Sequence, residues 1–207
     1  MIRIKGCRGP PEAWEMDRVV LPWKGEEFLL GSAPIAAGNY VLAYGSRPAG
    51  PAREMVLARI RIEDFLGLEM DRWEYFSGDG TDTAWSPLPG RAKGLFRGVG
   101  TEFTVAHDLN DGGWVCVYTP RGISPEVHLR RASHPQGPWG PAVVLYTCPE
   151  EAADPNLYCY GAKLHPECLG GGRMGSWITY TVNAKDSTPP RADEAKPRWV
   201  WITRQDQ

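Results

Sequence analysis

Two short segments of the sequence hold groups that can do acid–base or binding chemistry. The first is GTEFTVAH, in which Glu102 and Thr104 alternate with Phe103 and Val105. Alternate side chains of a strand point to opposite faces, so packing the apolar pair directs Glu102 to the open face. A carboxylate placed in this way can act as a general acid or base. The plain alternative is an exposed or arginine-paired strand carboxylate.

The second segment is YCYGAKLH, which carries a lysine and a histidine on one face. Alternation groups Lys163 with His165 and Ala162 with Leu164, and Pro166 follows directly after the histidine. An ammonium and an imidazole side by side can hydrogen-bond a polar ligand or move a proton. A structural histidine that is satisfied by a backbone carbonyl is the alternative.

Both segments belong to an internal repeat. Three strand-like segments end in tyrosine, namely YVLAY at 40–44, WVCVY at 114–118 and SWITY at 176–180. Each follows a glycine-containing turn and therefore predicts a hairpin with the segment before it. Further along, the aliphatic positions 57, 129 and 202 recur at separations of 72 and 73 residues.

The repeating unit is a four-stranded antiparallel meander, because RWEYF and AVVLY supply a fourth strand in the first two units. The chain contains 24 Gly and 19 Pro, and one helical turn is expected, at 62–67. Meanders that repeat at this period commonly stack radially, so the sequence predicts an all-β fold of the β-propeller type. A β-sandwich is the structural alternative.

The predicted blades cover residues 28–90, 91–150 and 151–207, and residues 1–27 are expected to be the end of a preceding blade or a linker. Three blades do not close a ring. We therefore expect additional N-terminal blades, missing from this chain, or partner chains to complete the fold. In a propeller the first strand of each blade lines the central channel, which places both polar segments there.

Composition excludes several kinds of partner. The net charge is -2, with 23 basic and 25 acidic residues interspersed, so no nucleic-acid partner is expected. No apolar run approaches the roughly 20 residues that cross a bilayer, and the N-terminus lacks a signal-peptide core, so no membrane partner is expected and localisation stays open. The nine tryptophans are compatible with sugar binding. Trp73 and Trp139, at matching repeat positions, are expected to pack between strands.

The five cysteines are an odd number without paired CxxC spacing, and no HExxH motif is present. No metal ligand set and no cofactor are therefore predicted. Cys148 and Cys159 flank a loop and can form a disulfide in an oxidising compartment, or remain separate buried thiols. Both alternatives are open at this stage.

Three stretches together resemble a bacterial family, the domain of unknown function DUF4185. They are RRASHPQGPWGPAVVLYTCPE at 130–150, YCYGAKLHPE at 158–167 and WITYTVNA at 177–184. The resemblance extends over about residues 28–183 and implies a five-bladed propeller related to glycoside hydrolases, with this chain supplying roughly the last three blades. Some members act as endo-acting enzymes on the D-arabinan of mycobacterial-type cell walls, which implies an extracytoplasmic or secreted location.

The resemblance also implies roles for individual residues. Glycosidases of this kind use two carboxylates, and Glu102 is expected to be the acid or a substrate-orienting carboxylate, with its partner in the missing blades. His165, Lys163 and Tyr160 resemble substrate-contacting residues, and Asn183 resembles a residue of the same rim. Five-bladed relatives sometimes hold a channel ion, for which this sequence shows no ligand cluster. A non-catalytic carbohydrate-binding propeller or an inactive fragment is the alternative function.

Overall fold

The strands of this protein form antiparallel sheets joined by short connections. A computed structural model describes residues 2–21, 28–78, 84–108, 112–168, 175–186 and 196–203. Within these ranges the α-helices are α1 (Ile62–Gly67) and α2 (Glu150–Ala153). The first of them coincides with the helical turn expected from the sequence. No helix in the described part of the chain is long and apolar enough to span a bilayer.

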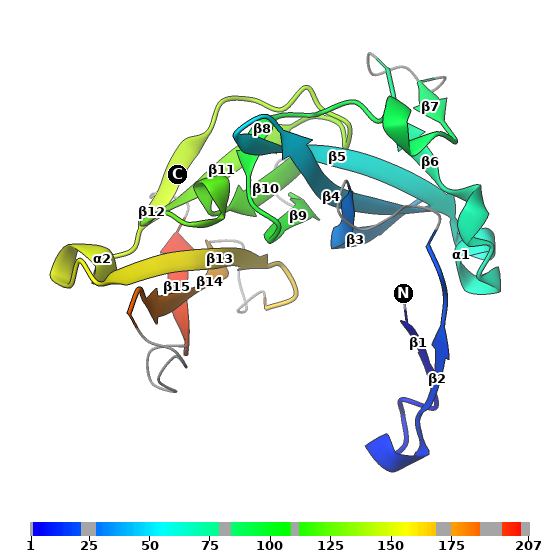
Figure 1. The fold of residues 1–207 in the computed structure, drawn as a ribbon, viewed down its shortest axis with the longest axis horizontal. Coiled ribbons are helices and arrows are strands. Elements are labelled where there is room, and N and C mark those ends of the chain that lie inside the picture. Colours follow the sequence, from blue (N-terminus) through cyan, green and yellow to red (C-terminus); the bar gives the residue numbers. More distant parts are fainter. Residues whose placement is uncertain are drawn as a thin grey trace.

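The first sheet is built from the first repeat unit. Its strands are β3 (Leu29–Ala37), β4 (Tyr40–Ala49), β5 (Ala52–Arg61), β6 (Glu74–Phe76) and β7 (Trp85–Ser86), and β8 (Arg97–Val99) pairs with β5. The long hairpin of β4 and β5 stays in register from Tyr40 opposite Arg61 to Ala49 opposite Ala52. Figure 1 shows this hairpin in blue and cyan, with α1 at its far end.

The second and third sheets repeat the meander. The second consists of β9 (Phe103–His107), β10 (Trp114–Tyr118), β11 (Glu126–Ala132) and β12 (Val143–Thr147). The third consists of β13 (Leu157–His165), β14 (Gly175–Ala184) and β15 (Pro197–Thr203). The strands thus follow one another in sequence order across the second and third sheets, as the repeat predicts, and in the first sheet β8 departs from this order by pairing with β5.

The three sheets pack face to face through two separate cores. Strand β10 shows why, because its alternating side chains are buried on both faces. Trp114 and Cys116 join the core shared with the first sheet, while Val115 and Val117 join the core shared with the third. A strand with apolar side chains on both faces must have another layer of the protein packed against each face to bury them. The second sheet therefore lies between the other two.

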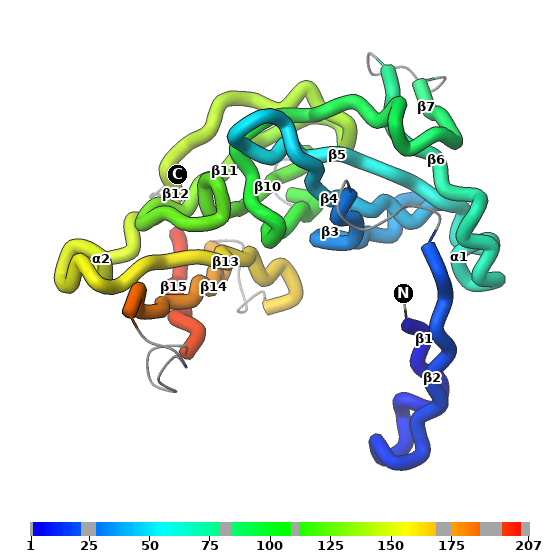
Figure 2. The backbone as a smooth tube through the Cα atoms, in the orientation of Figure 1, coloured from blue at the N-terminus to red at the C-terminus, as the bar shows by residue number. Residues whose placement is uncertain are grey.

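The first strands of the three units lie next to one another. Strand β9 contacts β3 on one side and β13 on the other. The order of the three sheets can be followed along the chain in Figure 2. This arrangement is that of neighbouring propeller-like blades, with β3, β9 and β13 as the inner strands. The all-β antiparallel prediction is confirmed.

The tyrosines that ended the three repeated segments are all buried and hydrogen-bonded. The hydroxyl of Tyr44 donates to the carbonyl of Pro135 at 2.8 Å, and that of Tyr118 accepts from Nε of Arg130 at 3.1 Å. Tyr180 donates to the carboxylate of Glu150 at 3.0 Å. Buried phenols of this kind need a partner, which explains why the same position recurs as tyrosine. Trp139 packs against the core between the first and second sheets, and Trp73 is buried in a further cluster of the first sheet.

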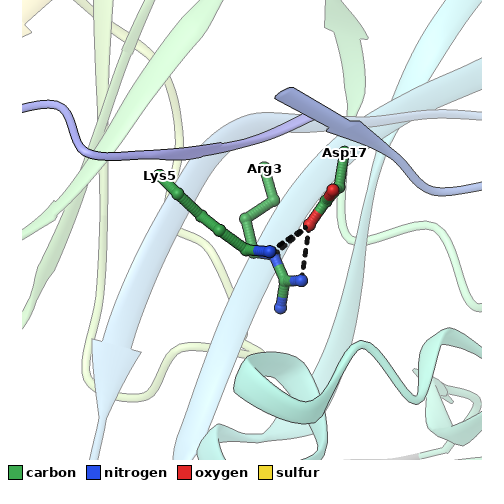
Figure 3. Close-up of polar contacts among 3 residues, drawn as sticks. All are labelled: Arg3, Lys5 and Asp17. Atoms are coloured by element: carbon green, nitrogen blue, oxygen red, sulfur yellow. Dashed lines mark hydrogen bonds and ion pairs between the residues drawn. The ribbon is translucent and has the colours of Figure 1, made fainter. Parts of the chain in front are cut away.

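The N-terminal segment forms a separate hairpin of β1 (Ile2–Lys5) and β2 (Glu15–Arg18). In Figure 1 it extends away from the three sheets. Figure 3 shows Arg3 and Lys5 converging on the carboxylate of Asp17, with Arg3 Nε at 3.0 Å and Lys5 Nζ at 3.1 Å from Oδ2. Val19 and Leu21, which follow the hairpin, pack against a third buried cluster, which includes Val56 and Tyr75 of the first sheet.

Candidate functional site

The candidate site lies where the inner strands β9 and β13 meet, and its geometry depends on a β-bulge in β13. The pairing of β13 with β14 shifts between Tyr160 and Lys163. Gly161 sits in this bulge with φ of 65°, a left-handed conformation that glycine adopts without strain. The extra residue brings Tyr160 and Lys163 onto the same face of the sheet, although they are three positions apart.

Glu102 lies across from this bulge. A side chain at Gly161 would place its Cβ 3.2 Å from Oε2 of Glu102, so the carboxylate rests against the bare glycine backbone. Glu102 itself is exposed, whereas the following Phe103 is completely buried in the core. The alternation expected from the sequence therefore holds, and the carboxylate is open to an incoming ligand.

Lys163 bridges the two inner strands. Its ammonium donates a hydrogen bond to the carbonyl oxygen of Phe103 at 2.9 Å. Burial lowers the pKa of Lys163, and the nearby negative charge of Glu102 opposes this shift. The site thus combines an exposed carboxylate with a half-buried cation held in a fixed position.

Two tyrosine rings continue the same face. The centroids of Tyr158 and Tyr160 are 5.7 Å apart, with an interplanar angle of 32°. The pKa of Tyr160 is raised mainly by burial and further by Tyr158 and Glu102. Aromatic faces beside a carboxylate suit sugars, because the rings stack on C–H groups while charged oxygens accept hydroxyl hydrogen bonds.

His165 lies on the same face but engages different partners. Its Nε2 is 2.8 Å from Oγ1 of Thr179 and its Nδ1 is 2.9 Å from a carboxylate oxygen of Glu167. The imidazole also lies against the ring of Trp199, with centroids 4.8 Å apart. These contacts fix the histidine among residues of β14, β15 and the turn after β13. Glu102 is not among these partners.

Asn183 lies near the other end of β13. It pairs with Tyr158 in the register, while His165 pairs with Trp177. At about 3.3 Å per residue, six positions along β14 separate the two ends by about 20 Å. The side chain of Asn183 accepts a hydrogen bond from the backbone N–H of Ala184 at 2.9 Å. The structure therefore brings Glu102, Tyr160 and Lys163 together and leaves His165 and Asn183 at opposite ends.

A pocket at the far end of the first sheet offers less to a ligand. Arg59 lines it together with Tyr40 and Glu74. The guanidinium donates to Glu74 at 2.8 Å and lies over the rings of Tyr40 and Trp85 at 4.5 and 4.1 Å. Since its cation is already engaged by a carboxylate and two rings, this cluster stabilises the end of the sheet.

The thiols considered for a disulfide are buried neighbours. Cys148 and Cys159 are each 1% exposed and both are free. The pKa of Cys148 is raised, first by burial and then by Cys159, with which it shares a hydrogen bond. Of the two alternatives, the structure has the unlinked thiols, and it places them in contact.

The fold and site define an all-β protein of propeller-like antiparallel sheets with a polar cluster between two inner strands. The model of the family described as domain of unknown function DUF4185 matches residues 9–186, so the chain belongs to this family. The resemblance drawn from the sequence is confirmed. No curated protein matches the sequence.

A solved structure shares the fold. It is the crystal structure of a putative hydrolase from Bacteroides ovatus ATCC 8483, with a TM-score of 0.63 and 16% sequence identity. The match covers 86% of this chain and 45% of that chain. The present chain therefore spans less than half the length of that protein, and the similarity at this identity concerns the fold alone.

Proposed function

We propose that this chain carries part of the substrate site of a carbohydrate-active hydrolase, in which Glu102 is the reacting or substrate-orienting carboxylate. The observation that carries this proposal is the position of Glu102 against the Gly161 bulge, next to Lys163 and Tyr160. An exposed carboxylate, a fixed cation and an aromatic pair supply the three kinds of contact that a sugar uses. The substrate class we favour is arabinan or a related cell-wall polysaccharide, on the family resemblance.

Glycoside hydrolysis requires two carboxylates, one of which protonates the leaving oxygen while the other acts as nucleophile or base. Glu102 supplies one. We propose that its partner lies in further blades, which complete the ring of a five-bladed propeller. The match to less than half of a longer hydrolase-type chain supports this proposal. In such an assembly Lys163 orients the substrate through its remaining ammonium hydrogens.

The test is a comparison of Glu102→Gln with the exposed-carboxylate control Glu69→Gln in the complete protein. Release of reducing ends from arabinan is measured beside binding of arabino-oligosaccharides by calorimetry. A general acid contributes about 10²- to 10⁴-fold, so we expect Glu102→Gln to lose hydrolysis by about that factor and to keep binding. Unchanged hydrolysis in Glu102→Gln overturns the assignment.

A second candidate function, non-catalytic carbohydrate binding, is favoured by the Tyr158–Tyr160 pair. The same experiment separates the two functions. Binding without turnover in the complete wild-type protein supports the binding module, and Tyr160→Ala should then weaken affinity by about 2- to 10-fold, the size of one aromatic contact.

A further inference from the structure

We propose that His165, Glu167 and Cys168 form a binding site for a divalent transition-metal ion, with Zn²⁺ as the ion that the donors favour. Each residue offers one ligand atom, and these atoms lie within 4.8 Å of one another. This site is separate from the cluster around Glu102 and does not depend on the function proposed for that cluster.

The local backbone brings the three donors together. Strand β13 ends at His165, and the backbone N–H of Cys168 donates to the carbonyl oxygen of His165 at 3.1 Å. This hydrogen bond closes a tight turn, so the side chains of residues 165, 167 and 168 project to a common point. The side chain of Glu167 is 65% exposed, which leaves it free to rotate toward an ion.

The histidine is oriented through contacts on its other side. Metal-bound histidines generally use their second ring nitrogen in a hydrogen bond that fixes the ring. Here Nε2 of His165 meets the hydroxyl of Thr179 at 2.8 Å, and Thr179 is itself buried. Trp199 supports one face of the imidazole. Nδ1 is thereby aimed at Glu167 and Cys168.

A metal ion at this site would replace the proton on Nδ1 of His165, which now lies in the hydrogen bond to Glu167. An ionised carboxylate only accepts, so Nδ1 carries a hydrogen, and in the neutral imidazole Nε2 accepts from the hydroxyl of Thr179. When a metal takes the place of the Nδ1 proton, the tautomer reverses and Nε2 donates to the same hydroxyl, which serves in either role. Thr179 therefore supports both forms of His165.

The donor set selects the kind of ion. Imidazole, thiolate and carboxylate together suit Zn²⁺ and related transition metals, whereas Ca²⁺ and Mg²⁺ require oxygen ligands. Bonds of about 2.0 to 2.3 Å to these atoms require a small inward movement, which the exposed Glu167 side chain allows. Three protein ligands leave a fourth position open to water or to a hydroxyl of a ligand.

The experiment uses the whole chain after removal of metal by chelation. Zn²⁺ is titrated by calorimetry, and Co²⁺ is used as a spectroscopic probe, because a cobalt–thiolate bond gives a charge-transfer band in the near ultraviolet. Cys168→Ser is compared with Cys7→Ser, which removes an exposed cysteine elsewhere in the chain. Thr179→Val tests the orienting hydroxyl, and circular dichroism verifies folding of each variant.

We expect one equivalent of Zn²⁺ to bind, and the cobalt band to vanish in Cys168→Ser and persist in Cys7→Ser. Thr179→Val should lower the affinity for Zn²⁺ by about 10- to 100-fold, which is the usual effect of removing a hydrogen-bond partner that orients a metal-binding histidine. Bound Zn²⁺ should also protect Cys168, and not Cys7, from alkylation. A cobalt band that survives in Cys168→Ser, or a wild-type affinity for Zn²⁺ no higher than that of Cys168→Ser, overturns the site.

Discussion

The ammonium of Lys163 in β13 donates to the backbone carbonyl of Phe103 in β9 at 2.9 Å. Two further bonds join the neighbouring sheets in the same manner, from the N–H of Leu164 to the hydroxyl of Thr104 and from that of Ala162 to the hydroxyl of Thr119. Side-chain groups thus bond to two backbone N–H groups at the inner edge of β13. In the part of the chain that the structure describes, this edge pairs with no further strand of the sheet and forms an isolated bridge between Tyr160 and Ile123. Lys163 therefore has a structural role in joining β13 to β9.

Replacement of this lysine should loosen the junction. We expect Lys163→Met to lower the free energy of unfolding by about 1.5 to 3 kcal/mol, because a hydrogen bond from a charged group is lost and a buried carbonyl is left without it. Lys93→Met, at an exposed position, should stay within about 0.5 kcal/mol of the wild type. Urea denaturation followed by tryptophan fluorescence measures both. Equal stability of the two variants contradicts the prediction.

The bulge glycine can be tested with an internal control. Gly161→Ala and Gly38→Ala both place a side chain at positive φ, of 65° and 57° respectively, and each should cost about 1 to 2 kcal/mol. Only the alanine at 161 meets Glu102, since the space at Gly38 is open. Carbon NMR of the Glu102 carboxyl group should therefore shift in Gly161→Ala and stay unchanged in Gly38→Ala.

The repeated tyrosine in the first sheet predicts a stability effect of its own. Tyr44→Phe removes the hydrogen bond to Pro135 and leaves a partly buried carbonyl without that donor. We expect the free energy of unfolding to fall by about 1 kcal/mol or somewhat more. Tyr40→Phe keeps the ring beneath the Arg59 cation and serves as the control. A smaller loss for Tyr44→Phe than for Tyr40→Phe is the contrary result.

The strands could be predicted because their spacing repeats along the chain. Tyr44, Tyr118 and Tyr180 each end a buried apolar run, and the same burial and hydrogen-bonding demand acts on each unit. Alternation alone placed Glu102 opposite the buried Phe103. In these strands the alternation of apolar and polar residues matches the faces that are buried and exposed, so the sequence alone predicts them.

The environment of His165 could not be predicted in the same way. Its partners Thr179 and Trp199 come from strands whose register depends on the bulge at Gly161, and strict alternation does not reveal a bulge. Tyr160 reaches the face of Lys163 for the same reason. The family resemblance groups Asn183 with His165, whereas the register separates their positions along β14. The sequence HPEC at 165–168, with three metal-ligand residue types within four positions, was the available signal for the proposed metal ligands Glu167 and Cys168.

The cysteines should differ strongly in reactivity. Cys116, Cys148 and Cys159 are buried, and burial raises the pKa of each thiol, so little thiolate is available to attack a reagent. Cys7 is exposed and should be alkylated first. Mass spectrometry of the protein after brief treatment with iodoacetamide, with and without denaturant, measures the order. Modification of Cys116 before Cys7 in the native protein is the opposing outcome.

The N-terminal hairpin should respond to acid through Asp17, which Arg3 and Lys5 approach in Figure 3. Hydrogen bonds from Arg3 and then Lys5 lower the pKa of Asp17 below its ordinary value of 3.8. A carboxylate with a lowered pKa stabilises the folded form above its unfolded pKa, and this contribution disappears as pH falls through the folded value. The hairpin should therefore hold at neutral pH and loosen below 3.8. Amide chemical shifts of β1 and β2 during an acid titration measure this, and in Asp17→Asn the transition should be absent.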